Sequence, residues 1–244
     1  MTIRVALLYP ELLGTYGDGG NATVLAQRLR WRGLNAETVT VAAGEAIPDS
    51  CDVYLLGGGE DGPQNLAAEE LARSGALTRA VGRGAAALAV CAGFQLLGKT
   101  FVGPDGRPHV GLGLLDCNTR RGPGRRRIGE MVVTPEAFAL PQLTGYENHQ
   151  GVTRLGDDCR PLGTVVSGNG NDSGDRSEGA VNGRVLGTYL HGPVLARNPA
   201  LADLLLSWVV GPLSPLDDAE VEELRDQRLA FARRRLWPLR TIAV

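Results

Sequence analysis

The stretch Ala85-Ala-Ala-Leu-Ala-Val-Cys91-Ala-Gly93-Phe-Gln95-Leu-Leu-Gly98 joins an apolar run, a cysteine, two small residues and the start of a helical pattern. This order is typical of a nucleophile elbow, in which a strand turns sharply into a helix and presents one reactive side chain. The dipole of such a helix stabilises a thiolate at its N-terminus, and the N–H of Ala92 is placed to donate to a developing oxyanion. Cys91 is therefore the candidate nucleophile.

Most free cysteines are structural and behave as small buried hydrophobic residues. Its position at a strand-to-helix turn favours the reactive interpretation for Cys91 alone. Cys51, Cys117 and Cys159 lack that context, so we expect them to be structural. The four cysteines form no C-x-x-C pair and no cluster with histidine that would indicate a metal site.

Working outward from Cys91, strand-like and helix-like patterns alternate along most of the chain. Such alternation predicts an α/β fold with a mostly parallel central sheet and helices on both faces. The predicted strands are residues 3–9, 36–41, 52–56, 85–90 and 185–190, and the predicted helices are residues 21–32, 64–80, 93–97 and 198–210. In such sheets, ligands bind beyond the carboxyl ends of the strands.

Three other regions depart from this alternation. Short strands and turns at residues 111–166 predict antiparallel excursions, and the polar, glycine-rich residues 168–179 predict a mobile loop. Residues 217–236 predict a charged final helix. We therefore expect a single domain over residues 1–210 and a C-terminal helical extension over 211–244, packed on the domain or on a partner.

Composition excludes several classes of protein. The net charge of −2 over 244 residues provides no field that would favour nucleic acid. The N-terminal apolar run is too short for a signal peptide, and no apolar stretch is long enough to span a membrane, so we expect a cytoplasmic protein without membrane insertion. No G-x-x-x-x-G-K-[ST] element is present, so any ATP-dependent step belongs on another chain.

A thiol nucleophile needs a base. His191 follows the predicted strand at residues 185–190, which places it at the same edge of the sheet as Cys91. His149 lies in the antiparallel region and is a weaker candidate. His109 lies in a Gly/Pro-rich turn, and we expect it to face solvent.

Two motifs together resemble class I (triad-type) glutamine amidotransferases of the cobyric acid synthase-like branch. They are Val90-Cys91-Ala-Gly93-Phe-Gln95 and Tyr189-Leu-His191-Gly-Pro193, and Gly145-Tyr-Glu147-Asn-His149 also fits that branch. The resemblance implies a flavodoxin-like fold. It also implies that Cys91 forms a glutamyl thioester with glutamine and that His191 protonates the departing ammonia.

The sequence is similar in particular to the glutaminase subunits of lipid II isoglutaminyl synthases. Tyr16-Gly17-Asp18-Gly19-Gly20-Asn21, Leu56-Gly57-Gly58-Gly59-Glu60-Asp61 and Arg126-Arg127-Ile128-Gly129-Glu130 carry this similarity. It implies a heterodimer with a Mur-ligase-like synthetase, which would hold ATP and Mg²⁺ and would use the ammonia to amidate D-glutamate of lipid II. No cofactor is implied for this chain.

The same resemblance implies roles around the thiol. The N–H groups of Gly59 and Ala92 would form the oxyanion hole, and Gln95 would help to hold glutamine. Arg126 would pair with the glutamine α-carboxylate, for which a guanidinium is well shaped. Arg125 or Arg127 could bind the carboxylate instead of Arg126. Alternatively, the three arginines form a solvated cluster or a patch that faces a partner.

One departure concerns the third catalytic group. Many class I members have a glutamate two residues after the histidine, where this chain has Pro193. The resemblance suggests a carboxylate supplied by the partner. Asp18 is a competing candidate that we rank lower, because Asp18 in a glycine-rich turn is also a typical helix cap.

Three alternative functions remain open. The chain could serve another ATP-dependent synthetase, for example in a corrinoid pathway. It could be a non-enzymatic regulator, although the presence of both Cys91 and His191 argues against this. It could be a cysteine hydrolase or peptidase, which the Gln95 and Glu147 matches disfavour.

Overall fold

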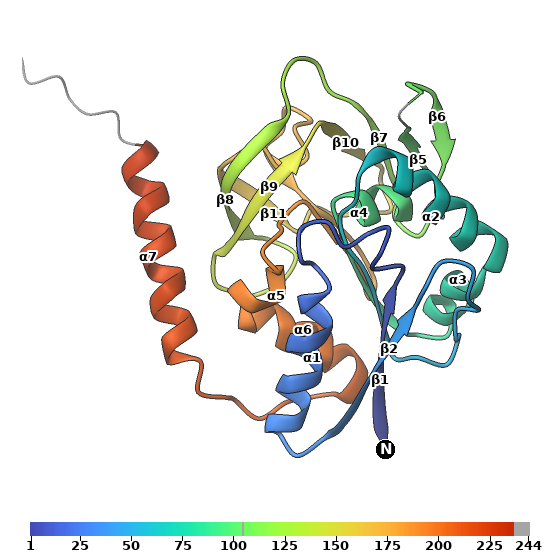
Figure 1. Cartoon of the computed structure of the whole chain (residues 1–244). Helices are drawn as coiled ribbons and strands as arrows, with labels where there is room; N and C mark the ends of the chain where they lie inside the picture. The colour runs from blue at the N-terminus through green and yellow to red at the C-terminus, as the bar shows by residue number, and fades with distance from the viewer. Residues whose placement is uncertain (104, 237–244) are drawn as a thin grey trace, which may run out of the picture.

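A six-stranded sheet forms the centre of the computed structural model, which describes residues 1–103 and 105–236 (Figure 1). Five strands are parallel, and only the edge strand β13 is antiparallel to its neighbour. The order is β13 (Ala180–Asn182), β14 (Val185–Thr188), β4 (Ala86–Val90), β3 (Val53–Leu56), β1 (Thr2–Leu8) and β2 (Asn35–Val41). Every residue of β3, β4 and β14 is buried. This explains their uninterrupted apolar sequences, because parallel strands are covered on both faces.

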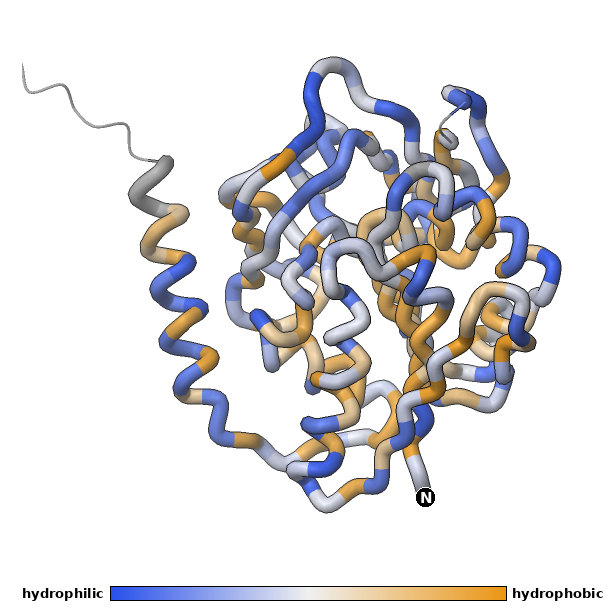
Figure 2. Tube along the Cα trace, in the orientation of Figure 1, coloured by the Kyte–Doolittle hydropathy of each residue, from blue (hydrophilic) through white to orange (hydrophobic). Residues whose placement is uncertain are grey.

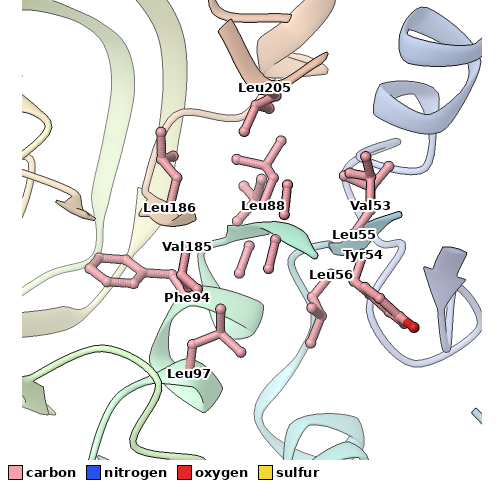
Figure 3. Packing of buried hydrophobic residues seen from close by; sticks show 14 of the residues in the cluster. Val53, Tyr54, Leu55, Leu56, Leu88, Phe94, Leu97, Val185, Leu186 and Leu205 are labelled. Carbon is pink, nitrogen blue, oxygen red and sulfur yellow. The ribbon is translucent and has the colours of Figure 1, made fainter. Parts of the chain in front are cut away.

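Helices cover both faces of the sheet, which confirms the predicted α/β fold. α1 (Gly20–Trp31), α5 (Val194–Arg197) and α6 (Pro199–Val210) pack together on one face, and α2 (Asp61–Ser74), α3 (Ala76–Gly82) and α4 (Ala92–Leu97) lie on the other. Figure 3 shows Leu205 of α6 on one side of Leu88 in β4, and Leu97 of α4 on the other. The core is therefore two apolar layers on the two faces of one sheet.

The antiparallel excursions form two smaller sheets of four strands each. One has the order β10 (Gly151–Leu155), β7 (Cys117–Arg121), β5 (Thr100–Val102) and β6 (Pro108–Val110); the other has β12 (Ser177–Glu178), β11 (Gly163–Ser167), β8 (Arg127–Pro135) and β9 (Leu143–His149). All their pairings are antiparallel except that of β5 with β7. β9 meets the central sheet where Tyr146 and His191 exchange backbone hydrogen bonds of 3.0 and 2.8 Å. This bridge places β9 beside the carboxyl end of β14.

Residues 168–179, expected to form a mobile loop, are held by hydrogen bonds instead. Asn171 is fully buried, and its side chain donates to Ser177 Oγ and to the carbonyl of Gly179, at 3.1 and 2.9 Å. The backbone N–H groups of Asn169 and Gly170 donate to the Glu147 carboxylate. The polar composition of this segment therefore serves hydrogen bonding within the fold.

The last helix, α7 (Ala219–Leu236), stands beside the body of the molecule and contacts β8, β9 and α5 (Figure 1). Figure 2 shows hydrophilic and hydrophobic residues mixed along α7, in contrast to the apolar central strands. Residues 237–244 of the predicted extension lie outside the described residues, and the boundary at residue 210 stays a prediction. No helix of the described part of the chain has both the length and the apolar character needed to cross a membrane.

Candidate active site

Cys91 occupies a sharp turn between β4 and α4, as the sequence predicts. Its backbone has φ 52° and ψ −105°, a conformation that non-glycine residues rarely adopt and that is typical of strained functional sites. Gly93 makes the turn possible, because a Cβ there would lie 2.7 Å from Leu56 Cβ. The N–H of Gly93 donates to the carbonyl of Gly57 at 3.1 Å, which joins the turn to the end of β3.

His191 lies at the same edge of the sheet and is paired with Asp18. Its Nδ1 is 2.8 Å from Asp18 Oδ2, and both side chains are almost completely buried. Asp18 Oδ2 also accepts a hydrogen bond of 2.9 Å from the N–H of Gly58. Because a carboxylate only accepts, Asp18 holds a proton on His191 Nδ1 and leaves Nε2 to face the thiol.

The protonation of His191 reflects these neighbours. Burial lowers its pKa, but the interactions with Asp18 and with the Cys91 thiol outweigh burial and raise the pKa to about 10. Nε2 has no well-formed hydrogen bond within the described part of the chain. Catalytic contacts often tighten only when substrate binds. The pair is thus built to hold an imidazolium beside the sulfur.

Asp18 is the carboxylate that the structure places against His191, which corrects the expectation that a carboxylate from a partner is the better candidate. The expected alternative was a helix cap, but the N-cap of α1 is Gly19, and no side chain caps that end. Asp18 instead points across to the end of β14, 173 residues away in sequence. Asp18 therefore occupies the place of an orienting carboxylate beside His191, in a chain that has Pro193 where many class I members have a glutamate.

A pocket of about 180 Å³ opens onto the cysteine. Its lining brings together the candidate site residues, namely Gly59, Cys91, Ala92, Gln95 and Arg126. The neighbouring N–H groups of Gly58 and Gly93 are already bonded, to Asp18 and to Gly57. Those of Gly59 and Ala92 have no partner among the described residues, and they can donate to an oxyanion.

The three consecutive arginines have different surroundings. Arg126 lines the pocket and crosses to Asn148, donating to its Oδ1 and its carbonyl, both at 3.0 Å. Arg127 instead pairs with Asp172 at 2.8 Å, and Arg125 is absent from the pocket wall. Asn148 in turn donates to Tyr16 Oη at 2.8 Å, and the Tyr16 ring packs edge-on against His191. Of the three, only Arg126 lines the pocket and can meet an anionic group near the thiol; Arg120 and Arg121 of β7 also line it.

The other two histidines have different partners. His149 is buried and stacks on Tyr189 at 3.9 Å between ring centroids, with Nδ1 3.0 Å from the Gly151 carbonyl. Its Nε2 lies 3.5 Å from Glu147, so His149 supports the pocket wall. His109, expected to face solvent, is only one-third exposed and stacks on Phe101.

This geometry agrees with the protein family that the sequence matches. The family model described as the CobB/CobQ-like glutamine amidotransferase domain matches residues 4–199. The chain belongs to that family. As an amidotransferase, it is a glutamine-hydrolysing enzyme, and the buried thiol, imidazole and carboxylate are the groups that such hydrolysis needs.

This amidotransferase is also similar to two named relatives and to one solved structure. The Staphylococcus aureus (strain N315) lipid II isoglutaminyl synthase (glutamine-hydrolyzing) subunit GatD is 39% identical over 198 residues, covering 80% of this chain and 79% of the relative. The Streptococcus pneumoniae (strain ATCC BAA-255 / R6) subunit GatD is 36% identical, covering 84% and 79%. A crystal structure of a glutamine amidotransferase, at 23% identity, superposes with a TM-score of 0.59 and covers 84% of this chain and 98% of that one. It shows that the fold is shared.

Two residues of the amidotransferase site escaped the sequence analysis. Gln64 lies in α2 and lines the pocket, although its position in an ordinary helical pattern gave no signal. Glu178 is fully buried and accepts hydrogen bonds from Thr188 Oγ1 and the Tyr189 N–H, at 2.9 and 2.6 Å. These bonds fix the end of β14 just before His191. Because Glu178 lies in a polar, glycine-rich segment, its sequence context does not distinguish it from an exposed glutamate.

Proposed function

We propose that this chain is the glutaminase subunit of a lipid II isoglutaminyl synthase. The observation that carries the proposal is the buried Cys91–His191–Asp18 arrangement at a pocket, in a chain 39% identical to a subunit of that name. The substrate of this subunit is L-glutamine, and its products are glutamate and ammonia.

The reaction follows from the geometry. The Cys91 thiol gives its proton to His191 Nε2, the thiolate attacks the carboxamide carbon, and the N–H groups of Gly59 and Ala92 stabilise the oxyanion. His191 gives its Nε2 proton to the departing nitrogen, so that ammonia leaves and a glutamyl thioester remains. His191 then takes a proton from water, which attacks the thioester, and returns that proton to the Cys91 sulfur as glutamate leaves. Asp18 keeps the imidazole in the required orientation throughout.

Two further steps are the binding of glutamine in the pocket and the use of ammonia by a second protein. Gln95 and Arg126 would hold the α-amino acid end of glutamine, with the Arg126 guanidinium meeting the α-carboxylate. Ammonia would pass to a Mur-ligase-like synthetase that binds ATP and Mg²⁺ and amidates the D-glutamate of lipid II. The similarity to subunits of the isoglutaminyl synthase supports such a heterodimer.

The test is glutamate release from L-glutamine, by the purified chain and by the chain co-expressed with a Mur-ligase-like partner. Release that disappears in both Cys91→Ser and His191→Ala would support the proposal. Full activity without the partner would show that Asp18 suffices as the orienting carboxylate. No glutamate from either preparation would contradict the assignment and favour a regulatory role.

A further inference from the structure

Gln64 lines the pocket and bonds directly to the side chain proposed to hold the substrate. Its side chain is buried, with 3% of the residue exposed. Its Nε2 donates to Gln95 Oε1 at 2.9 Å and to the backbone carbonyl of Ala92 at 3.3 Å. Both hydrogens of the Gln64 amide are thus used within the site.

The carbonyl of Ala92 determines which way the Gln64 amide points. A backbone carbonyl can only accept a hydrogen bond, so the NH₂ group of Gln64 must face it. The same NH₂ group then faces Gln95. The Gln95 amide consequently has to present its oxygen to Gln64 and its nitrogen to the opposite side.

A second set of hydrogen bonds holds the other end of the Gln95 amide. Gln95 Nε2 donates to Tyr189 Oη at 3.3 Å, and Tyr189 Oη lies 2.7 Å from Thr153 Oγ1. Thr153 Oγ1 continues to Thr119 Oγ1 at 2.8 Å. The Tyr189 ring is fixed by its stacking on His149. Gln95 therefore sits between a donor on one side and an oxygen that can accept on the other.

Such a fixed amide has one free N–H and one free oxygen lone pair. Gln95 lines the pocket with Cys91, and these are its groups that can meet a substrate. The α-carboxylate of glutamine accepts hydrogen bonds and its α-ammonium donates them. A Gln95 amide with a defined orientation matches both groups, whereas a freely rotating one spends part of its time inverted.

We propose that Gln64 is a positioning residue that fixes the orientation of the Gln95 amide and thereby sets the affinity for glutamine. This inference rests on the proposed function. Gln64, a side chain of α2, would exert this role through Gln95. The competing interpretation is a purely structural tether between α2 and α4, which are in contact.

The test compares variants of the full chain in glutamate release and in thermal stability. Gln64→Glu replaces the donor by an acceptor, so Gln95 must invert. Gln64→Leu removes the donor without adding charge. We expect the KM for glutamine to rise about tenfold in either variant, the value of roughly one good hydrogen bond, with kcat changed less than about threefold. Gln27→Glu, on α1 and outside this pocket, is the matched control and should leave KM unchanged.

A double-mutant cycle shows whether Gln64 acts through Gln95. Gln64→Leu should raise KM in the wild-type background and have no further effect in a Gln95→Leu background. An equal rise in both backgrounds would overturn the proposal, as would an unchanged KM with lower kcat and lower melting temperature.

Binding of L-glutamine to Cys91→Ser, measured by calorimetry, separates the two proposals. If glutamine binds and Gln64→Leu weakens that binding, the inference stands even if the wild-type chain proves inactive. If glutamine binds equally well with and without Gln64→Leu, the inference fails while the proposed function is untouched. If glutamine does not bind at all, both fail.

Discussion

Asp18 and His191 form a buried pair, and one oxygen of the Asp18 carboxylate, Oδ2, makes the contact. Asp18 Oδ2 accepts from both His191 Nδ1 and the Gly58 N–H, while Oδ1 has no partner among the described residues. Among the described residues, the Asp18 carboxylate is thus bonded to the imidazole and to one backbone N–H. This explains how a chain with Pro193 in place of the usual glutamate can still hold its histidine in one tautomer.

Replacing Asp18 by asparagine should remove this charge with little change of shape. Asp18→Asn should lower kcat by about 10³-fold, because a neutral amide neither stabilises the imidazolium nor fixes its tautomer. Steady-state glutamate release measures the effect, and Asp49→Asn, on the exposed Arg83 pair, is the control. If the carboxylate comes instead from a partner subunit, Asp18→Asn will retain near wild-type activity in the assembled complex.

Glu178 should give the unfolding free energy a pH dependence of defined sign. Burial raises its pKa from 4.5 to about 7, against the opposing hydrogen bonds from Tyr189 and Thr188. Because the folded pKa is the higher one, its stabilising contribution is complete below pH 4.5 and is lost as the pH rises to about 7.

Glu178→Gln mimics the protonated side chain and removes this titration. Relative to the variant, the wild-type protein should lose on the order of 3 kcal/mol between pH 4.5 and 7. Urea unfolding of both proteins at several pH values measures the difference. A difference that is constant with pH would show that Glu178 is ionised at no cost in the fold.

At the scale of elements, the site is made by loops at the ends of β1, β3, β4 and β14. The close approach of these loops depends on the glycines after β3. A Cβ on Gly58 would lie 2.5 Å from His191 Cε1 and 3.3 Å from Asp18 Oδ2. The loop after β3 is thus packed directly against His191 and Asp18.

Gly58→Ala should therefore displace the His191 ring while leaving the sheet intact. We expect glutamate release to fall by at least about 10²-fold, since small displacements of catalytic groups have large effects on rate. Gly62→Ala is the matched control, because a Cβ at Gly62 meets nothing within 4 Å. Equal activity of the two variants would contradict this account of the glycine.

The sequence was sufficient to predict the parallel sheet, because β3, β4 and β14 are short apolar runs that end at recognisable turns. It was also sufficient to predict the turn at Cys91 and the placement of His191 at the same edge of the sheet. It was not sufficient for Asp18 or Gln64. Their hydrogen-bond partners lie 173 and 31 residues away, and their local patterns match a helix cap and an ordinary helix. Nothing in the sequence indicated that residues 168–179 are held in place, because their hydrogen bonds reach back to Glu147, which is distant in sequence.

At the scale of the whole molecule, Arg28 connects distant parts of the chain. Its guanidinium pairs with Asp203 in α6 and with Asp218 just before α7, both at 2.7 Å. The Arg28 side chain is only 4% exposed. Burial raises the pKa of Asp203, but the bonds from Arg28 and Arg32 outweigh it and hold that pKa below its ordinary value. The cluster joins α1, α6 and the segment leading to α7.

Arg28→Met should lower the free energy of unfolding by about 2 kcal/mol, because it leaves partly buried carboxylates without their main partner. Urea unfolding measures this loss. The KM for glutamine should not change, since the cluster lies away from the pocket. Arg73→Met, on an exposed pair with Glu70, is the control and should change stability by less than about 0.5 kcal/mol. Equal effects of the two substitutions would show that the Arg28 cluster adds nothing.

Covalent labelling can show whether Cys91 is a nucleophile in a glutamine-binding pocket. The measurement is the intact mass and peptide map of the chain after incubation with 6-diazo-5-oxo-L-norleucine, a glutamine analogue that alkylates thiols. We predict a single adduct on Cys91, prevented by excess L-glutamine, absent in Cys91→Ser and with Cys51, Cys117 and Cys159 unmodified. No adduct on Cys91, or labelling that glutamine does not prevent, would contradict the claim.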